Sequence, residues 1–409
     1  MGDGQKTLLF IGGGIETLPG VDLAKKMGLN VIVSDRNLEA PCMAVADDCI
    51  IADTYDEKHT LLAAKKFHHS KRNIDGVICM ASDIPLTVAT VAFGLSLPGI
   101  PVASAKIVAD KLLMKNCFKV AGLPIPRYQE IHSIIELKEK AKNFGFPFVI
   151  KPVDSRGARG VFKVTKNVDI EWAFITAKSF SPTARVMIEE YMPGPQVSTE
   201  SLIINGDVFT IGFSDRNYEF LEKYAPNMIE NGGDLPSKLK EKEQSLIREA
   251  VEETAKALNI KNGVIKGDMV LSNQNPYIIE VAARLSGGYF CSHEIPLNTG
   301  VNFVGNAIKI ALGEDIKKEE LKVKSNNPIS QRYLFPKPGK VIKIEIPKWV
   351  GESKSVIMCE IRVKVGEIIP EVTQHPSRAG VVICRGSNLK EAQQTAKKVV
   401  DEVLIETVS

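Results

Sequence analysis

The stretch FPFVIKPVDSRGARGVFKV (residues 146–164) consists of two apolar runs that flank a polar loop containing glycine. The Val, Ile and Phe residues of the two runs predict short strands. The end of the first strand and the loop supply small residues at Ser155, Gly157 and Gly160, and positive charges at Lys151, Arg156 and Arg159. Accessible backbone N–H groups beside fixed positive charge suit a phosphate tail. An ordinary hairpin would show the same pattern, and the Walker signature G-K-[ST] does not follow.

A second polar pattern lies in GDMVLSNQNPYIIEVAARL (residues 267–285), where polar residues join two apolar runs. Asp268 and Glu280 are equally distant from residue 274, so an antiparallel hairpin would set the two carboxylates nearly opposite each other. The two-residue period of a strand puts Arg284 on the face of Glu280. Facing carboxylates repel unless a cation lies between them, and Mg²⁺ that bridges substrate phosphates is a common solution. The alternative, two solvated acids on an exposed sheet face, is disfavoured by the apolar flanking residues.

The N-terminal segment LLFIGGGIETLPGVDLAKKMGLNVIVSDRN (residues 8–37) has the order of a dinucleotide-binding fold: strand, glycine turn, helix and strand. A G-x-G-x-x-G fingerprint that starts at Gly12 has Thr17 at its third position, so the fingerprint is broken, although Asp35 stands where a ribose-binding acid would. A nicotinamide-dependent oxidoreductase is therefore an alternative that these glycines support only weakly. The turn can still line a substrate pocket, because ligands collect at the carboxyl ends of parallel strands.

Composition argues against several classes of function. The 52 Lys and Arg residues nearly balance the 49 Asp and Glu residues, so no strong positive field favours nucleic acid or an anionic membrane. The seven cysteines are scattered without a C-x-x-C pair, which argues against a disulfide framework and a zinc site. No apolar run approaches the roughly 18 residues of a membrane span, and no signal-peptide pattern follows Met1. We therefore expect a cytoplasmic protein without nucleic-acid or membrane partners.

The chain length of 409 residues suggests roughly two to three domains. Residues 7–105 alternate strand-like runs with helical stretches, which indicates a parallel sheet with helical crossovers. One helix is expected over residues 105–122, with Ser104 as its cap. Further along, tight turns such as Asn205-Gly206 predict antiparallel strands. Residues 316–409 are expected to form a smaller appended domain.

Together these motifs resemble those of the ATP-grasp ligases over essentially the whole chain. The closest resemblance is to carboxylate–amine ligases of the glycinamide ribonucleotide synthetase, biotin carboxylase and L-amino acid ligase type. It implies an ATP-grasp fold of mixed α/β and α+β class. Its expected parts are an N-terminal Rossmann-like pre-ATP-grasp domain (1–105), an ATP-grasp domain (106–315) with a mobile subdomain at about 120–192, and a small C-terminal lid-like domain (316–409).

The resemblance also assigns roles to the residues that match the family's motifs. Arg284 and Lys151 correspond to catalytic residues, and Asp268 and Glu280 to the two metal carboxylates. The residues expected to bind ATP are Lys111, Lys151, Ser155, Gly157, Gly160, Gln196 and the hinge Glu189-Glu190-Tyr191-Met192, whose backbone reads adenine in the family. The chain departs from the family at Gln196, where many members have a glutamate, and at Ala282, where many have an asparagine.

The implied reaction is activation of a carboxylate by the γ-phosphoryl group of ATP to an acylphosphate, followed by attack of an amine. The expected cofactors are ATP and Mg²⁺ or Mn²⁺, the expected substrates are amino-acid-like carboxylates and amines, and a homodimer is the expected assembly. The residues expected to bind these substrates are Glu16, Thr17, Ser82, Asp83, Glu200, Arg284 and Gly287, with the segments 214–217 and 230–237. An ATP-grasp protein that binds a nucleotide without turnover is a further alternative beside the oxidoreductase.

Overall fold

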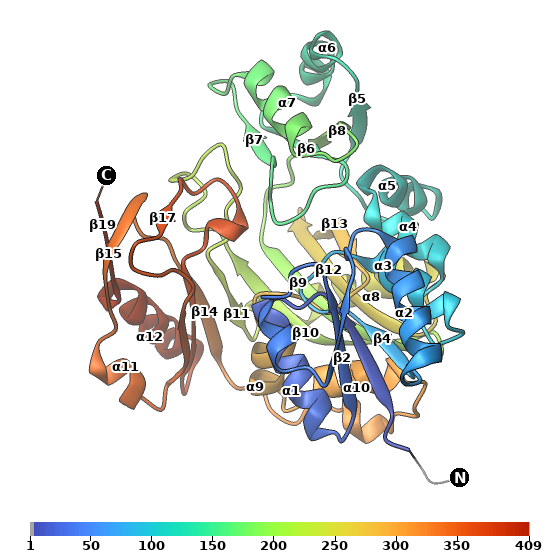
Figure 1. Ribbon diagram of the computed structural model, residues 1–409. Helices are drawn as coiled ribbons and strands as arrows, with labels where there is room; N and C mark the ends of the chain where they lie inside the picture. The colour runs from blue at the N-terminus through green and yellow to red at the C-terminus, as the bar shows by residue number, and fades with distance from the viewer. Residues whose placement is uncertain (1–3, 409) are drawn as a thin grey trace.

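Four parallel strands form the N-terminal sheet, in the order β3-β2-β1-β4, which confirms the predicted parallel sheet. The computed structural model describes residues 4–408, and Figure 1 shows helices packed around this sheet. The elements here are β1 (Thr7–Ile11), η1 (Ile15–Thr17), α1 (Leu18–Lys26), β2 (Asn30–Asp35), η2 (Pro41–Ala44), β3 (Asp48–Ile51), α2 (Glu57–Ser70), β4 (Gly76–Ile78) and α3 (Pro85–Gly94). Alternate residues of β1 are buried in different layers, Leu8 and Phe10 with helix α10 (Phe303–Ala311), and Leu9 and Ile11 with α2 and α3.

Two helices follow the N-terminal domain, α4 (Val102–Ala109) and α5 (Lys111–Val120). The prediction of a single helix over residues 105–122 is wrong, because the backbone of Asp110 is extended and its side chain accepts hydrogen bonds from the next helix's N–H groups. Ser104 is not a cap either. It lies inside α4, where its hydroxyl donates to the Leu258 carbonyl at 2.5 Å. Asp110 thus acts as an N-cap in the middle of a helical pattern and starts a second helix.

A small antiparallel sheet with the order β5-β8-β6-β7 lies at the top of Figure 1. Two of its four strands, β6 and β7, are formed by the apolar runs of residues 146–164, and they pair with Phe148 opposite Val164. This pairing confirms the predicted strand–loop–strand unit. Two helices pack against the sheet through a core that includes Phe148, Phe162 and Phe174. The elements are β5 (Tyr128–Ile131), α6 (Ile134–Phe144), β6 (Phe148–Pro152), β7 (Phe162–Val164), α7 (Ile170–Ser179) and β8 (Val186–Glu190).

An eight-stranded antiparallel sheet occupies the centre of the molecule, in the order β13-β12-β9-β10-β11-β14-β18-β16. The last three of these strands lie beyond residue 315 in the sequence, so one continuous sheet joins the central and C-terminal parts of the chain. The strands are β9 (Gln196–Ile204), β10 (Asp207–Asn217), β11 (Gly232–Leu235), β12 (Gly263–Ser272), β13 (Asn275–Ala282), β14 (Ile329–Leu334), β16 (Val356–Ile361) and β18 (Gly380–Arg385). The helix α8 (Glu241–Ala257) packs on this sheet through residues such as Ile247 and Val251.

The remaining elements lie in the sequence between or after the last strands of the large sheet. A three-stranded sheet with the order β17-β15-β19 lies at the left edge of Figure 1, beside a C-terminal helix. Among residues 4–408, no helix combines the length and apolar character that crossing a bilayer would need. These elements are η3 (Phe290–Glu294), α9 (Ile295–Thr299), η4 (Lys318–Leu321), β15 (Gly339–Glu345), α11 (Lys348–Glu352), β17 (Ile368–Ile369), η5 (His375–Ser377), α12 (Leu389–Glu402) and β19 (Leu404–Val408).

Candidate active site

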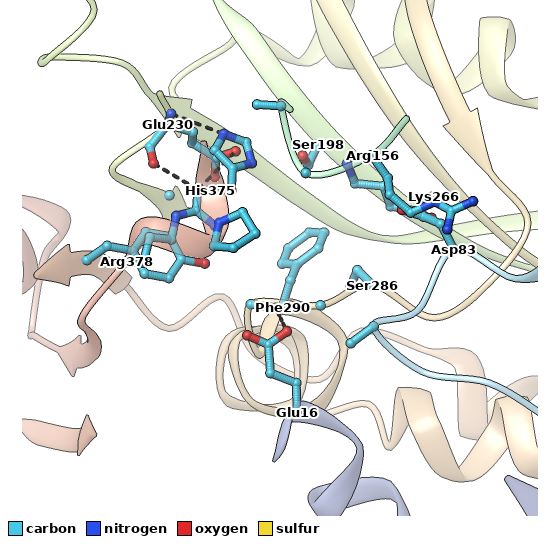
Figure 2. A pocket seen from close by; sticks show the side chains of 18 of the residues that line it. Glu16, Asp83, Arg156, Ser198, Glu230, Lys266, Ser286, Phe290, His375 and Arg378 are labelled. Carbon is cyan, nitrogen blue, oxygen red and sulfur yellow. Dashed lines mark hydrogen bonds and ion pairs between the residues drawn. The ribbon is translucent and has the colours of Figure 1, made fainter. Parts of the chain in front are cut away.

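Two hollows meet at the β12–β13 hairpin. The larger, which we call the polar cavity, has a volume of about 640 Å³ and is lined mainly by charged and polar side chains. The smaller, which we call the narrow cleft, has a volume of about 120 Å³ and is lined by residues of the four-stranded and the eight-stranded antiparallel sheets. Asp268 and Glu280 line both hollows, so the hairpin lies where they join. Figure 2 shows side chains from the N-terminal domain, the large sheet and the C-terminal segment converging on the polar cavity.

Asp268 and Glu280 are direct cross-strand partners, as the sequence predicts. The hairpin reaches this pairing by a different route from the one assumed. Its turn is formed by Asn273 and Gln274, both with positive φ, half a residue before the centre used in the prediction. One extra residue on β13, Ile279, then bulges and restores the alignment of the two acids. The bulge therefore aims both carboxylates at the junction of the hollows.

Positive charges already surround Asp268. Arg216 lies 3.1 Å from its Oδ1 atom, Lys266 pairs with Oδ2, and the Ser198 hydroxyl donates at 2.8 Å. Burial alone would raise the pKa of Asp268, but Arg216 and Lys266 outweigh burial and hold the pKa below its usual value. Glu280 is more open, with 41% of its side chain exposed and its carboxylate 3.5 Å from the Nζ atom of Lys111. Of the two acids, Glu280 is the one with free coordination capacity.

A buried group of two lysines and one glutamate forms the wall of the narrow cleft. The carboxylate of Glu189 lies 2.8 Å from Lys115 Nζ and 2.6 Å from Lys151 Nζ. Lys115 also donates to the Ile278 carbonyl at 2.9 Å, and burial lowers its pKa to about 8. Two cations on one buried carboxylate leave net positive charge at this wall, which favours an anionic ligand in the cleft.

The glycine loop between β6 and β7 covers the junction of the two hollows. Lys111 Nζ donates to the Ser155 carbonyl at 2.7 Å, so α5 holds one end of the loop. The backbone N–H of His375 donates to the Gly157 carbonyl at 3.1 Å, so the C-terminal segment holds the other side. The Arg156 guanidinium lies over the ring of Tyr55 at 4.4 Å, which ties the loop to the N-terminal domain. All three parts of the chain therefore contact this loop.

Two of the predicted substrate residues, Asp83 and Arg284, form an ion pair in the polar cavity. Two nitrogens of the Arg284 guanidinium, Nε and one terminal NH group, lie 2.7 and 2.6 Å from Asp83 Oδ1. Burial opposes ionisation of Asp83, but the arginine outweighs burial and keeps the pKa of the carboxyl below its usual value. The N-terminal domain thus positions the arginine that follows β13.

A second N-terminal acid, Glu16, closes the floor of the polar cavity. Its carboxylate accepts from the backbone N–H of Gly288 at 2.7 Å and pairs with Arg362 at 2.8 Å. Gly287 lies so near that a Cβ atom there would stand 2.6 Å from Glu16 Oε2. A larger residue at position 287 would therefore displace the Glu16 carboxylate, which connects the N-terminal domain to both neighbouring segments.

Comparison with known protein families gives two matches that cover the site. Residues 108–288 match the model of the ATP-grasp domain. This range includes the glycine loop and the β12–β13 hairpin at which the two hollows meet. Residues 108–288 therefore form an ATP-grasp domain. Residues 332–408 match the model of the L-amino acid ligase C-terminal domain 2, a range that supplies Arg362, His375 and Arg378. The two matched models together place the chain among the ATP-grasp ligases.

Individual relatives span nearly the whole chain. Formate-dependent phosphoribosylglycinamide formyltransferase of Saccharolobus solfataricus is 23% identical over 419 residues, which is 98% of this chain and 98% of that protein. The crystal structure of L-amino acid ligase from Bacillus licheniformis superposes with a TM-score of 0.84 at 22% identity, covering 99% of each chain. The biotin carboxylase domain of Hydrogenobacter thermophilus 2-oxoglutarate carboxylase, solved with MgADP and bicarbonate, gives a TM-score of 0.75 at 16% identity and covers 99% of this chain and 91% of that chain. At these identities, the structural likeness demonstrates the shared ATP-grasp fold.

The residues at the junction fit a divalent cation bound in the manner usual for Mg²⁺, through one or two carboxylates together with substrate phosphates. Within residues 4–408, no third His, Cys, Asp or Glu joins Asp268 and Glu280 to make a metal cluster. Ala282, where many ATP-grasp members have an asparagine, lines a small hollow next to the junction but offers no ligand atom. Asp268 and Glu280 would supply at most two carboxylate ligands, so phosphate oxygens and waters would complete the coordination.

Most of the predicted nucleotide residues line the narrow cleft. Lys111, Lys151, Ser155, Gly157, the hinge Glu189 to Met192 and Gln196 all do so. Gly160 does not, because it packs against Phe180 and Pro152 with a φ of +69°, which makes it a turn residue. Its role is to shape the loop.

Two predicted substrate residues lie outside the polar cavity. Thr17 is buried, and its hydroxyl donates to the Met80 carbonyl at 3.2 Å, so the side chain points into the N-terminal core. Glu200 lies beneath the cavity floor, where the backbone N–H and the hydroxyl of Ser286 donate to its carboxylate. Burial raises the pKa of Glu200 to about 7. The other predicted substrate residues, Glu16, Ser82, Asp83, Arg284 and Gly287, line the cavity.

Asp35 forms hydrogen bonds within the N-terminal glycine turn that follows β1. The carboxylate of Asp35 accepts from the N–H groups of Gly13 at 2.8 Å and Asn37 at 2.9 Å. A Cβ atom on Gly13 would stand 3.1 Å from Ala40 and 3.2 Å from Val33. Asp35 therefore stabilises the turn rather than presenting a free acceptor for a ribose, which removes the main support for the oxidoreductase alternative.

Several residues of the site were not predicted from the sequence. Lys266 lies two residues before Asp268, so the strand period would have placed it on the same face. Arg216 and Glu230 were predicted only as members of the segments 214–217 and 230–237, which are the end of strand β10 and strand β11 with its flanking residues. The residues contributed by distant segments without a local signal are Lys115, Phe290, Glu294, Tyr333, Arg362, His375 and Arg378.

Proposed function

We propose that the protein activates a small-molecule carboxylate as an acylphosphate with ATP and joins it to an amine. The observation that supports this most strongly is the position of Asp268 and Glu280, which line both the narrow cleft and the polar cavity. A nucleotide in the cleft would direct its terminal phosphate to this hairpin, and a substrate in the cavity would meet it there. We propose amino-acid-like compounds as the substrates.

In the first step, the negatively charged substrate carboxylate has to approach the negatively charged γ-phosphate of ATP. A carboxylate oxygen of the substrate attacks the γ-phosphorus, and the bond from that phosphorus to the oxygen of ADP breaks. Positioning and charge stabilisation supply most of the catalysis in phosphoryl transfer. Lys111 and Lys151 would contact the phosphates from the cleft, while Arg284 and Lys266 face the cavity side. A Mg²⁺ ion on Glu280 and Asp268 would neutralise phosphate charge when bound.

The second step forms the new carbon–nitrogen bond. The amine attacks the acyl carbon, and inorganic phosphate leaves with the electron pair of the C–O bond and takes up the proton that the amine releases. Arg284 is placed to stabilise the negative charge that develops at the carbonyl oxygen, as a guanidinium does for an oxyanion. Asp83 holds this arginine in place through two short contacts.

Exclusion of water matters because an acylphosphate is hydrolysed readily. The glycine loop is held over the junction by Lys111, His375 and Tyr55, which come from three separate parts of the chain. We propose that this loop opens to admit the nucleotide and closes for the reaction.

The test is ADP release by the purified protein with Mg·ATP and a panel of the 20 proteinogenic amino acids, alone and in pairs, with mass spectrometry of the products. The proposal expects ADP formation that requires a substrate pair and a product whose mass is the sum of the pair less one water. ADP formation without any condensed product, or no stimulation by any pair, would contradict it.

A further inference from the structure

Glu294 is the one acid lining the polar cavity that is deeply buried and has no partner within the described residues. It ends the short helical turn η3, is 2% exposed, and forms no hydrogen bond or ion pair through its carboxylate with any residue from 4 to 408. The other deep acids are matched, Asp83 with Arg284 and Glu230 with Arg216. An unpaired buried carboxylate is costly unless a ligand supplies the missing positive charge.

The surroundings of Glu294 increase this demand for a cation. Arg332, whose positive charge acts on Glu294, is committed to Asp234 through contacts of 2.9 and 3.3 Å. Burial, followed by the charges of Glu230, Asp234 and Glu200, raises the pKa of Glu294 well above its usual value, and Arg332 opposes this only in part. A cation placed beside Glu294 would therefore pair with a buried carboxylate that no arginine already neutralises.

The corner in front of Glu294 also has room for a ligand. A Cβ atom on Gly233 would stand 3.8 Å from Glu294 Oε2 and 2.7 Å from the Ser214 hydroxyl, so the glycine keeps this space open. Phe290 and Tyr333 also line the cavity, and Figure 2 shows the Phe290 ring projecting between the Arg378 side and the Lys266 side. Aromatic rings beside a carboxylate suit an ammonium group with its attached carbon chain.

We propose that the Glu294 carboxylate binds the ammonium group of a substrate and thereby selects compounds that carry an amine as well as a carboxylate. The inference rests on the proposed function, because the substrate carboxylate would lie toward Arg284 and Lys266 while its ammonium lies toward Glu294. Glu294 is a specificity residue in this arrangement and takes no part in the phosphoryl transfer.

The experiment is isothermal titration calorimetry with Mg²⁺ and a non-hydrolysable ATP analogue present. The probes are matched pairs that differ by one ammonium group: L-leucine and 4-methylpentanoate, L-phenylalanine and 3-phenylpropanoate, and L-lysine and L-norleucine. The proteins are the unmodified chain, Glu294→Gln, Glu294→Asp, and the control Glu319→Gln, which makes the same change of charge on an exposed residue.

In at least one pair, we expect the member with the additional ammonium group to bind the unmodified chain about tenfold or more tightly than the other member. A charge-assisted hydrogen bond implies a difference of this size. Glu294→Gln should remove this difference without weakening the binding of the other member, Glu294→Asp should retain part of it, and Glu319→Gln should retain all of it. The melting temperature of Glu294→Gln should be unchanged or raised, because the variant removes an unpaired buried charge.

The inference would be overturned if Glu294→Gln and the unmodified chain showed the same ratio of affinities within each probe pair. It would also be overturned if none of the ammonium-bearing probes bound saturably. Binding is measured without turnover, so the two proposals can fail separately. Ammonium selection without ADP formation would refute only the proposed ligase reaction, whereas ADP formation that is indifferent to Glu294 would refute only the role of this residue.

Discussion

Glu280 lies opposite Asp268 across the β12–β13 pair and 3.5 Å from Lys111 Nζ, so a single carboxylate faces the narrow cleft, the polar cavity and the helix that holds the glycine loop. This position explains why the proposed reaction depends on the hairpin more than on any other element. It also makes Glu280 the residue whose charge is the most informative to remove.

Glu280→Gln should lower the rate of ADP formation by about a hundredfold or more, because a neutral amide is a poor ligand for Mg²⁺ and loses the pair with Lys111. The fold should be retained, since the side chain is 41% exposed. The measurement is coupled-assay kinetics across a range of Mg²⁺ concentrations. Glu252→Gln, an exposed residue of α8, is the matched control, and near-normal turnover in Glu280→Gln would mean that the metal assignment is wrong.

Arg284→Lys should lower kcat/KM by about a hundredfold, because a lysine cannot present the two nitrogens that now contact Asp83 and would stabilise the developing oxyanion. Asp83→Asn should have a smaller effect, mainly on kcat, because the arginine remains but is held less firmly. Steady-state kinetics of both variants checks this order. A larger loss in Asp83→Asn than in Arg284→Lys would indicate that Asp83 itself contacts the reacting groups.

Gly287→Ala should destabilise the protein by about 1–3 kcal/mol and weaken substrate binding, because the new Cβ atom would displace Glu16 from Gly288 and Arg362. Denaturant unfolding and KM measurements test both effects. The control is Gly14→Ala, where no atom lies within 4 Å of the added carbon, and we expect its free energy of unfolding to change by less than about 0.5 kcal/mol.

Glu200 gives a pH-dependent prediction. Its folded pKa of about 7 lies above the ordinary value of 4.5, so the native state keeps a proton that the unfolded state releases between these pH values. The stability that this proton contributes is complete below about pH 4.5 and is lost as the pH rises through 7. Glu200→Gln should remove this loss, which is at most roughly 3 kcal/mol for a group of this burial.

The measurement is the free energy of unfolding of Glu200→Gln and the unmodified chain at pH 5 and pH 8. The variant should gain relative stability at the higher pH. An unchanged difference between the two proteins across this range would show that Glu200 is ionised in the folded state at both pH values.

The sequence predicted local structure where a short-range pattern controls it. The pairing of Asp268 with Glu280 follows from strand periodicity and symmetric spacing, although the actual turn at Asn273-Gln274 needs a bulge at Ile279 to produce the same alignment. The failure at residues 105–122 has a local cause as well. Asp110 fits a helical pattern by its spacing, but its side chain caps the following N–H groups and breaks the helix in two.

The parts of the site that the sequence did not predict depend on distant contacts. Lys115 lies one helical turn after Lys111 on the same helix, and nothing in the local pattern shows that it is fully buried against Glu189. Arg362 and His375 reach the site only because β14, β16 and β18 extend the central sheet and bring the C-terminal segment over the glycine loop. Such placements follow from sheet order, which residue spacing alone does not specify.

The central claim is that the γ-phosphoryl group of ATP passes to the oxygen of a substrate carboxylate. The most direct measurement uses a stimulating substrate in which both carboxylate oxygens are ¹⁸O. The inorganic phosphate that is released under single-turnover conditions is analysed by mass spectrometry. We predict one ¹⁸O atom in each phosphate, because the acyl C–O bond breaks when the amine attacks. Phosphate without ¹⁸O, whose fourth oxygen came from water and not from the substrate, would contradict the acylphosphate route.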